Sequence, residues 1–326
     1  WFALGFQDVG TQVTLGASKP ASSGLNWIVD ILNGSSVAVA TGSPGGTPVS
    51  FTIPTGGAGS YYARIRSSGA SDFLAQYRLV LSLTDTTPPM ITASTLPAEG
   101  SRTTTLLDRF TLTFSKDLEA STVNNPANYD LRAAGLDGSL DTADDVVVPL
   151  VLNAAYTSGL SATLRTANGG ALPAGNYRFK ALPGLIDRFL NALSPVYTRS
   201  FGVDLVPGYV QETEPNNTRA AATTLAIEST QPNLFGAGGR GYLLNGSDID
   251  FWSFSLQAGD RVYVQGEVPG TPASTGLYYE ISNPAGTVLS SMYAETNGPF
   301  AFGVFTAADA GAYTLRVAQW HGYYGE

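Results

Sequence analysis

The chain has 326 residues, of which 43% are hydrophobic and only 13% are charged, so two or three domains with well-filled cores are expected. The formal net charge of −9 excludes a surface built to bind duplex nucleic acid, which needs Lys and Arg against phosphates. The absence of cysteine excludes disulfides, thiolate nucleophiles and Cys-ligated zinc.

Targeting and membrane segments are not evident in the sequence. It contains no signal peptide, no lipidation motif and no apolar run of about eighteen residues. The chain begins at Trp1 instead of Met, so we expect a processed or partial sequence whose targeting signals lie outside it.

Strand-like alternation runs along the whole chain, whereas helical periodicity is nearly absent. Apolar and polar residues alternate at residues 110–114, 177–181 and 313–317, so each run places its apolar side chains on one face. Turn-forming sequences such as Asn33-Gly34 separate these runs. Many short strands at this spacing predict an all-β protein made of β-sandwiches. The best helix-like stretches are short, at 184–193 and 219–225.

Two proline-containing segments divide the chain. Residues 85–89 read Asp-Thr-Thr-Pro-Pro, and residues 205–211 contain Pro207. We therefore predict three β-sandwich domains in series, which would occupy residues 1–84, 90–204 and 212–326.

The first and third of these segments resemble each other. Motifs around Gly24 and Gly59 recur around Gly276 and Gly311, in both cases 252 residues later. A constant offset between separate motifs indicates an internal repeat. The first copy lacks a counterpart of residues 208–250, and the third lacks a counterpart of the strand at 77–81. We expect that the sequence is a window of a longer array or that neighbouring molecules complete each other's sheets by strand addition.

The third segment resembles the bacterial pre-peptidase C-terminal (PPC) domain. The matching residues are Glu212-Thr213-Glu214-Pro215-Asn216-Asn217, the run from Asn245 to Phe254, residues 256–260, and Gly311-Ala312-Tyr313-Thr314-Leu315-Arg316-Val317. The first segment resembles the C-terminal two-thirds of the same domain.

The middle segment resembles bacterial Ig-like domains at residues 114–118, 125–129 and 172–177. Together the two resemblances imply jelly-roll-like and Ig-like sandwiches in a secreted, extracellular or cell-surface protein. PPC domains often follow exoproteases, and some relatives bind calcium or fibrous substrates.

A calcium site is the best hypothesis for chemistry in the third segment. Glu212, Glu214, Asn216, Asp248 and Asp250 offer the carboxylate and amide oxygens that hard cations prefer. The family resemblance implies that the acidic opening segment and the Asp-x-Asp before the Phe-Trp strand come together. The alternative is that the two aspartates cap a turn while the glutamates are solvated linker charges.

A second acidic loop offers another candidate for calcium. It contains Asp137, Asp141, Asp144 and Asp145, with Gly138 for a sharp turn. It lacks the ligand spacing and flanking helices of an EF-hand. We therefore favour a polar hairpin tip that uses Asp and Gly for turn geometry over a metal site.

The sequence gives little support for catalysis. The one histidine, His321, lies in an aromatic loop, and no G-x-S-x-G elbow supplies a nucleophile. Residues 236–241 match the G-x-G-x-x-G spacing, but a strand-like run follows them where a dinucleotide site needs a helix. We interpret these glycines as a flexible loop and expect that the chain is not an enzyme.

The aromatic loop has a binding interpretation of its own. Trp320, Tyr323 and Tyr324 would form a platform for a sugar ring or a fibrous partner. Collagen-binding relatives use aromatic residues in the corresponding region, with Trp320 in register. Packing in the core or between domains is the alternative, and we favour it.

These observations favour a structural segment of a repetitive bacterial surface or extracellular protein, stiffened by calcium. Such a protein would form a surface layer, stalk, sheath or filament. Its partners would be other copies of itself, other surface proteins, a polysaccharide or a fibrous protein, without nucleic acid or membrane insertion. The alternative is a polymer- or cell-binding module of a secreted exoenzyme or adhesin.

Overall fold

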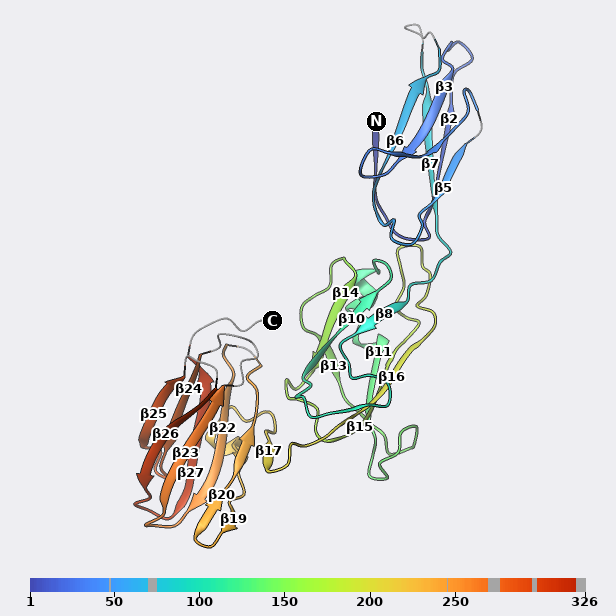
Figure 1. The fold of residues 1–326 in the computed structure, drawn as a ribbon. Coiled ribbons are helices and arrows are strands. Elements are labelled where there is room, and N and C mark those ends of the chain that lie inside the picture. Colours follow the sequence, from blue (N-terminus) through green and yellow to red (C-terminus); the bar gives the residue numbers. More distant parts are fainter. Residues whose placement is uncertain (47, 70–74, 245, 269–275, 295–297, 321–326) are drawn as a thin grey trace.

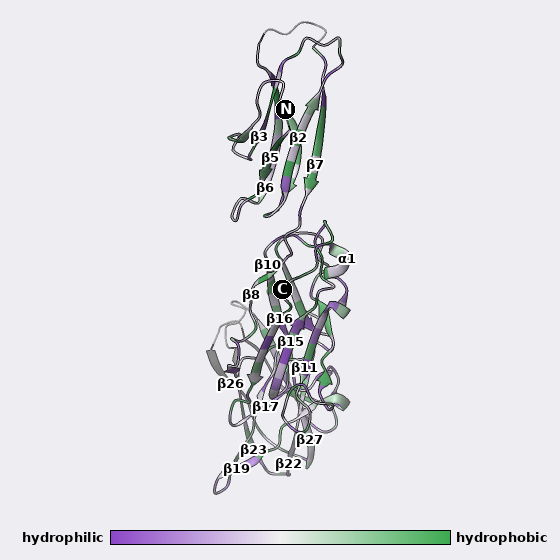
Figure 2. Cartoon of the chain, turned by 90° about the vertical axis from the view of Figure 1, so that its right-hand side faces the viewer, coloured by the Kyte–Doolittle hydropathy of each residue, from purple (hydrophilic) through white to green (hydrophobic). Residues whose placement is uncertain are grey.

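The computed structural model describes residues 1–46, 48–69, 75–244, 246–268, 276–294 and 298–320. It is nearly all β, as predicted, and Figure 1 shows three sandwiches that follow one another along the chain. In Figure 2 the N-terminal sandwich stands clear of the other two and is joined to them by a narrow connection. No helix in the described ranges has the length and apolar character needed to cross a membrane.

The N-terminal sandwich consists of two antiparallel sheets. One has the order β1 (Phe2–Gln7), β6 (Gly59–Ser67), β3 (Trp27–Leu32) and β4 (Ala38–Thr41). The other has the order β5 (Val49–Thr52), β2 (Gln12–Ser18) and β7 (Arg78–Thr84). Val13, Leu15 and Ile31 are fully buried between the sheets. Successive side chains of a strand point to opposite faces, so the alternating apolar residues all face this core.

The middle sandwich has a larger core between sheets of four and five strands. The first sheet has the order β13 (Leu150–Leu152), β14 (Ser161–Thr166), β10 (Arg109–Phe114) and β8 (Ile91–Ser94). The second has the order β12 (Val146–Val147), β11 (Tyr129–Ala133), β15 (Gly175–Ala181), β16 (Tyr197–Val203) and β9 (Arg102–Thr103). Two-sheet sandwiches occur in many families, so the Ig-like assignment stays a prediction.

Helical structure in the middle sandwich is confined to a place that the sequence did not indicate. The helix α1 (Ala120–Val123) and the 3-10 turn η1 (Pro126–Asn128) follow strand β10. The helix-like stretch 184–193 is irregular instead, because the Asp187 carboxylate accepts hydrogen bonds from the backbone N–H groups of Phe189 and Asn191. A side chain that satisfies nearby N–H groups in this way stabilises a loop in place of a helix.

The C-terminal sandwich has a five-stranded and a two-stranded sheet. The first has the order β18 (Thr223–Thr224), β22 (Ile249–Leu256), β27 (Gly311–Gln319), β24 (Leu277–Ser282) and β25 (Val288–Ala294). The second pairs β23 (Arg261–Val268) with β26 (Gly298–Thr306). Two small pairs join β17 (Tyr209–Gln211) to β21 (Gly238–Arg240) and β19 (Glu228–Gln231) to β20 (Leu234–Gly236).

The expectations for residues 236–244 of this sandwich were wrong. The glycine-rich stretch 236–241, expected as a flexible loop, supplies the end of β20 and all of β21, whereas the strand-like residues 242–244 form no strand. The helix-like stretch 219–225 forms only the 3-10 turn η2 (Arg219–Ala221) before β18.

All three sandwiches contain the same tyrosine contact. Tyr61, Tyr177 and Tyr313 each donate a hydrogen bond from the phenol to the backbone carbonyl four residues earlier, at 2.7, 2.7 and 3.0 Å. Each tyrosine is the last residue of a Gly-x-Tyr sequence and is at most 4% exposed. The contact fixes the loop before a core strand, as the tyrosine corner does in other sandwiches.

A buried ion cluster joins the first two sandwiches. The Lys116 ammonium lies 2.8 Å from Asp85 and 3.3 Å from Asp187, and the three side chains are at most 2% exposed. Lys116 also donates to the Thr87 carbonyl at 2.6 Å, within the connecting segment. Since buried charges are costly unless paired, this cluster fixes the connection against the middle sandwich.

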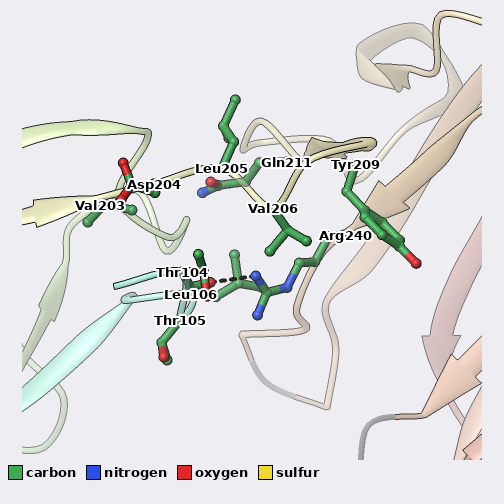
Figure 3. Close-up of a pocket in the computed structure, with 10 residues that line it drawn as sticks. All are labelled: Thr104, Thr105, Leu106, Val203, Asp204, Leu205, Val206, Tyr209, Gln211 and Arg240. Carbon is green, nitrogen blue, oxygen red and sulfur yellow. Dashed lines mark hydrogen bonds between the residues drawn. The ribbon is translucent and has the colours of Figure 1, made fainter. Parts of the chain in front are cut away.

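Polar contacts also join the middle and C-terminal sandwiches. Gln211 donates to the Leu172 carbonyl at 3.1 Å, and the Arg109 guanidinium donates to the Tyr242 hydroxyl at 2.9 Å. Figure 3 shows Arg240 reaching across a small pocket toward Thr104, whose backbone carbonyl accepts its hydrogen bond. Gln211 directly precedes Glu212, a member of the acidic cluster described next.

Candidate metal centre

Three carboxylates from two distant segments converge in the C-terminal sandwich. Glu212 and Glu214 lie in the loop that follows β17, and Asp250 lies near the start of β22. One oxygen from each of the three lies within 4.8 Å of the others. The family resemblance implied this convergence, and Asn216 lies on the same loop.

Asp250 occupies a position that would ordinarily hold an apolar side chain. It is 2% exposed, and the next residues on the same face of β22 are the buried Trp252, Phe254 and Leu256. Strand periodicity therefore directs this carboxylate toward the interior. A charge in such a position needs a counter-charge or a proton.

The neighbouring side chains are held so that one oxygen of each stays free. Glu212 accepts a hydrogen bond from the Tyr242 N–H at 2.7 Å, and Glu214 accepts one from the Asn216 N–H at 3.0 Å. The Asn216 side-chain amide donates to the Thr223 hydroxyl at 3.5 Å, which leaves the amide oxygen available.

Four oxygens remain buried without any hydrogen-bond partner. They are Glu212 Oε2, Glu214 Oε1, Asn216 Oδ1 and Asp250 Oδ1. Buried polar atoms in native proteins almost always have a partner, so four acceptors without one in one place mark a candidate site for a cation. Across the described residues, no Lys or Arg forms an ion pair with these carboxylates.

Burial and mutual repulsion perturb the acids strongly. Burial raises the pKa of Glu212 and of Asp250, and the charge of Glu212 raises the pKa of Asp250 further. Burial also raises the pKa of Glu214. These shifts have the direction expected when carboxylates share a poorly solvated site without a cation.

The donor set fits a hard divalent cation. Ca²⁺ takes oxygen ligands from carboxylates, amides and backbone carbonyls, in flexible geometry. Glu212, Glu214 and Asp250 would supply charge, and Asn216 a neutral oxygen. No histidine or cysteine is present in the set, so softer metals such as zinc or copper fit less well.

Asp248 accepts hydrogen bonds from the loop before β22, as the turn-capping alternative expects. One of its oxygens accepts a hydrogen bond from the Leu244 N–H at 2.6 Å, and the other accepts one from the Ile249 N–H at 3.0 Å. In the amide orientation that satisfies its surroundings, Asn217 also donates to Asp248 at 2.9 Å. These contacts hold the loop before β22, and the metal prediction for Asp248 stays untested.

Gly241 is a functional position that the sequence did not indicate. A Cβ atom there would lie 2.3 Å from Glu212 Oε2, so any larger residue would displace the carboxylate. Gly241 belongs to the glycine-rich stretch 236–241, which we interpreted from the sequence as a flexible loop. Its role depends on a contact with a residue some thirty positions earlier, which no local pattern encodes.

The second acidic loop has its carboxylates engaged within the loop and with one arginine. Asp137 accepts from the Ser139 N–H at 2.8 Å, and Asp145 accepts from the Asp141 N–H at 3.0 Å. The Thr142 hydroxyl donates to Asp144 at 2.6 Å. Asp141 also pairs with the buried guanidinium of Arg178. These contacts match the polar hairpin tip that we favoured, and the metal prediction for this loop stays untested.

Trp320 directly follows β27 and lies in a small aromatic cluster. Its ring centroid is 3.9 Å from that of Tyr293, and Tyr293 lies 4.9 Å from Tyr278. Tyr293 is 49% and Trp320 39% exposed, and the Arg316 guanidinium lies over Tyr278 at 5.5 Å. The other two predicted binding residues, Tyr323 and Tyr324, lie outside the described residues.

Residues 248–319 match the family described as the bacterial pre-peptidase C-terminal domain. The match extends over β22–β27 and includes Asp250, whereas the loop that carries Glu212, Glu214 and Asn216 precedes it. The C-terminal sandwich thus contains a PPC domain. No curated protein matches the chain.

Several solved structures show a remote likeness. The N-terminal part of the bacterial S-layer protein SbsC is 13% identical, with a TM-score of 0.27 over 68% of this chain and 45% of that one. Dimeric latent PorU from Porphyromonas gingivalis is 12% identical, with a TM-score of 0.25 over 97% of this chain and 28% of that one. The chain thus spans less than half the length of either protein.

In a third structure, more of the matched chain is covered but the TM-score is lower. SGBP-B of the mixed-linkage glucan utilization locus of Bacteroides ovatus, in complex with a heptasaccharide, is 14% identical, with a TM-score of 0.19 over 95% of this chain and 72% of that one. All three TM-scores lie far below 0.5, so no function is transferred from these proteins.

Proposed function

We propose that the chain is a non-catalytic structural segment of an extracellular or cell-surface protein, whose C-terminal sandwich is stabilised by calcium. The observation that carries the proposal is the set of four buried, unpartnered oxygens on Glu212, Glu214, Asn216 and Asp250. Bound calcium would neutralise the three carboxylates and join the loop after β17 to strand β22. The PPC domain supports the extracellular setting.

The position of the cluster connects calcium to the joint with the middle sandwich. Gln211, next to Glu212, bonds to Leu172, and Tyr242, whose N–H holds Glu212, bonds to Arg109. Both walls of the site therefore contact the middle sandwich. A cation that fixes these walls would also restrict movement between the two sandwiches.

The test is calcium titration calorimetry on the chelator-treated chain, with Asp250→Asn as the decisive variant. We expect binding with a Kd on the order of 0.1–1 mM or tighter, in the range of extracellular calcium modules. Asp250→Asn keeps the shape but removes a ligand charge, so calcium binding should be lost.

In the metal-free protein, Asp250→Asn should increase the thermal stability. Removing one of three clustered charges relieves repulsion, so the melting temperature in chelator should rise. The control is Asp309→Asn, which removes an exposed acid from the same sandwich and should change neither property. If titration of calcium into the unmodified chain released or absorbed no heat of binding, the proposal would be wrong.

A second candidate function is binding of a polysaccharide or a fibrous protein. The exposed rings of Tyr293 and Trp320, with Tyr278 and Arg316 beside them, favour it because aromatic faces and guanidinium groups suit sugars and extended chains. Trp320→Ala should weaken retention on such polymers in affinity electrophoresis. Equal retention of the variant and the unmodified chain would remove this candidate.

A further inference from the structure

The outer surface of the N-terminal sandwich carries two arginines that share one buried carboxylate. On β6, Tyr61 and Ala63 face the core, so Arg64 and Arg66 lie on the opposite, outer face. Asp30 lies on the neighbouring strand β3 and is fully buried (Figure 1). The Nε atoms of Arg64 and Arg66 donate to the same oxygen, Asp30 Oδ2, at 2.8 and 3.0 Å. The carboxylate therefore holds both guanidinium groups in place.

Both guanidinium groups keep donors for a further partner. The side chains of Arg64 and Arg66 are 32% and 43% exposed, whereas Asp30 is shielded beneath them. A guanidinium has more N–H donors than these contacts use. Burial would raise the pKa of Asp30, but the hydrogen bonds from Arg66 and Arg64 hold it below its ordinary value. The cluster thus contains one negative and two positive charges, and the positive ones face solvent.

Comparison with the C-terminal sandwich shows that the strand arrangement needs only one of these arginines. Arg64 and Arg316 occupy equivalent positions, each three residues after the tyrosine of a Gly-x-Tyr sequence and opposite an acid on the next strand. Two residues later stands Arg66 in the N-terminal sandwich but Ala318 in the C-terminal one. The sheet orders β1-β6-β3-β4 and β22-β27-β24-β25 match nonetheless. Arg66 is therefore an addition that this fold does not require.

The same comparison shows that solvent reaches this face in a longer sandwich. The C-terminal sandwich includes residues 208–250, which have no counterpart in the N-terminal one. Its corresponding outer face carries Arg316, which is partly exposed, and Tyr293, which is 49% exposed. Residues 208–250 thus do not close the face that corresponds to Arg64 and Arg66.

Aromatic rings lie beside the arginine pair. Tyr62 is two residues before Arg64 on β6 and so shares its outer face. The ring centroids of Trp1 and Tyr62 are 6.5 Å apart, and the Arg64 guanidinium lies 5.7 Å from the Trp1 centroid. Aromatic faces supply contact area for flat ligands such as sugar rings, and planar guanidinium groups pair with carboxylates through two parallel hydrogen bonds. A ligand that carries both rings and carboxylates would use the whole face.

The charge of the N-terminal sandwich suits an anionic ligand. Residues 1–84 contain four basic and three acidic residues, whereas the whole chain has a net charge of −9. Two of the three acids, Asp8 and Asp30, are buried. A polyanion would therefore be attracted to this sandwich and repelled by the remainder of the chain.

We propose that the outer face of β6 and β3 is a binding site for an acidic polysaccharide, whose uronate carboxylates pair with Arg64 and Arg66. The two arginines lie roughly 6.7 Å apart along one strand, so one polymer would engage both. Its sugar rings would pack beside Tyr62 and Trp1. This site is separate from the calcium cluster and from the aromatic cluster of the C-terminal sandwich.

The experiment is affinity electrophoresis of the 326-residue chain in gels that contain polygalacturonate, at low ionic strength and with chelator. The chelator removes calcium, so the outcome does not depend on the proposed calcium function. We expect the unmodified chain to be retarded and Arg66→Gln to raise the Kd at least about tenfold, because charge-assisted hydrogen bonds are lost. Arg66→Lys keeps the charge but lacks the planar fork, so it should restore only part of the affinity.

The matched control is Arg78→Gln, which removes an exposed arginine from β7 in the opposite sheet of the same sandwich. It should leave the Kd unchanged, and the melting temperatures of all variants check that they are folded. Equal weakening by Arg66→Gln and Arg78→Gln, or no retardation of the unmodified chain, would overturn the proposal. Equal retention on poly-glutamate would identify an acidic protein as the partner, and stronger retention on dextran sulfate would identify sulfate. Either result would overturn the assignment to a uronate polymer.

Discussion

Asp250 and Glu212 are two buried carboxylates that lie close together in the C-terminal sandwich. Both side chains are at least nine-tenths buried, and each has an oxygen without a hydrogen-bond partner. Burial raises the pKa of both groups, and repulsion from the neighbouring carboxylates raises the two pKa values further, so without a cation the cluster holds protons more readily. The stability of the C-terminal sandwich should therefore depend on pH and calcium together.

The sign of the pH dependence follows from the direction of these shifts. A carboxyl group whose pKa is raised by folding binds more protons in the folded state, so its stabilising effect is present below about pH 4 and is lost as the pH rises through the raised pKa. In chelator, the melting temperature of the C-terminal sandwich should fall between pH 5 and pH 8, and calcium should oppose the fall.

Thermal unfolding followed by circular dichroism at the two pH values checks this prediction. Burial also raises the pKa of Asp8 in the N-terminal sandwich, so the comparison with Asp250→Asn is needed to isolate the cluster. That variant should lose most of the fall, and Asp309→Asn should keep it. A melting temperature independent of pH in chelator would contradict the prediction.

The residue types offered oxygen ligands and the family resemblance implied that the two acidic segments meet, but neither gave the hydrogen bonds of each member. The alternating Glu212, Glu214 and Asn216 and the pair Asp248 and Asp250 all stood out as oxygen ligands. Only the structure shows that Asp248 uses its oxygens on backbone N–H groups while Asp250 keeps one free. Two aspartates separated by one residue look equivalent in sequence, because the loop geometry that distinguishes them depends on distant residues.

At the scale of elements, the short strand β21 and the residue after it shape one wall of the site. The chain at Gly241 passes so close to Glu212 that a methyl group would lie 2.3 Å from Oε2. Such close approach of backbone to a functional group is a common reason for glycine. The site therefore depends on the space that Gly241 leaves for Glu212 as well as on the ligand residues.

Gly241→Ala should weaken calcium binding by at least about tenfold, since the displaced Glu212 carboxylate would cost about 1.4 kcal/mol or more of binding free energy. The matched control is Gly236→Ala in β20, where a Cβ would meet only an ordinary contact of 3.5 Å with Thr230. Calorimetry on both variants checks the difference. Equal affinities would show that the Glu212 carboxylate is free to move, or that it does not bind the cation.

The strands themselves could be predicted well from alternation, as at 110–114, 177–181 and 313–317. The irregular connections could not. Residues 184–193 have helical spacing, but the Asp187 carboxylate captures the N–H groups that a helix would use. The shared Gly-x-Tyr sequence carried a signal for the tyrosine contacts, yet its meaning depends on a carbonyl that only the folded loop brings into reach.

At the scale of the whole molecule, the buried cluster at Lys116 determines how the first two sandwiches are joined. Its two aspartates come from different places, Asp85 from the connection and Asp187 from a loop of the middle sandwich. Removing the ammonium would leave two buried carboxylates without compensation, which is far more costly than losing a surface ion pair.

Lys116→Met should therefore destabilise this part of the molecule by about 3–5 kcal/mol. Lys180→Met, which replaces a partly exposed lysine on β15, should change stability by less than about 0.5 kcal/mol. Denaturant unfolding of both variants gives the comparison. A small effect of Lys116→Met would mean that water reaches the cluster in solution.

The same cluster limits how this joint can change in length. Asp85 accepts from Lys116 and from the Thr87 N–H, and Thr87 in turn offers its carbonyl to Lys116. Adding or deleting a single residue between Asp85 and Thr87 would shift one partner by roughly 3.5 Å, the span of one residue. The contacts of this connection therefore depend on its length as well as its composition, whereas exposed hairpin tips tolerate insertions. We expect related sequences to vary in their loops and to keep the length of this connection.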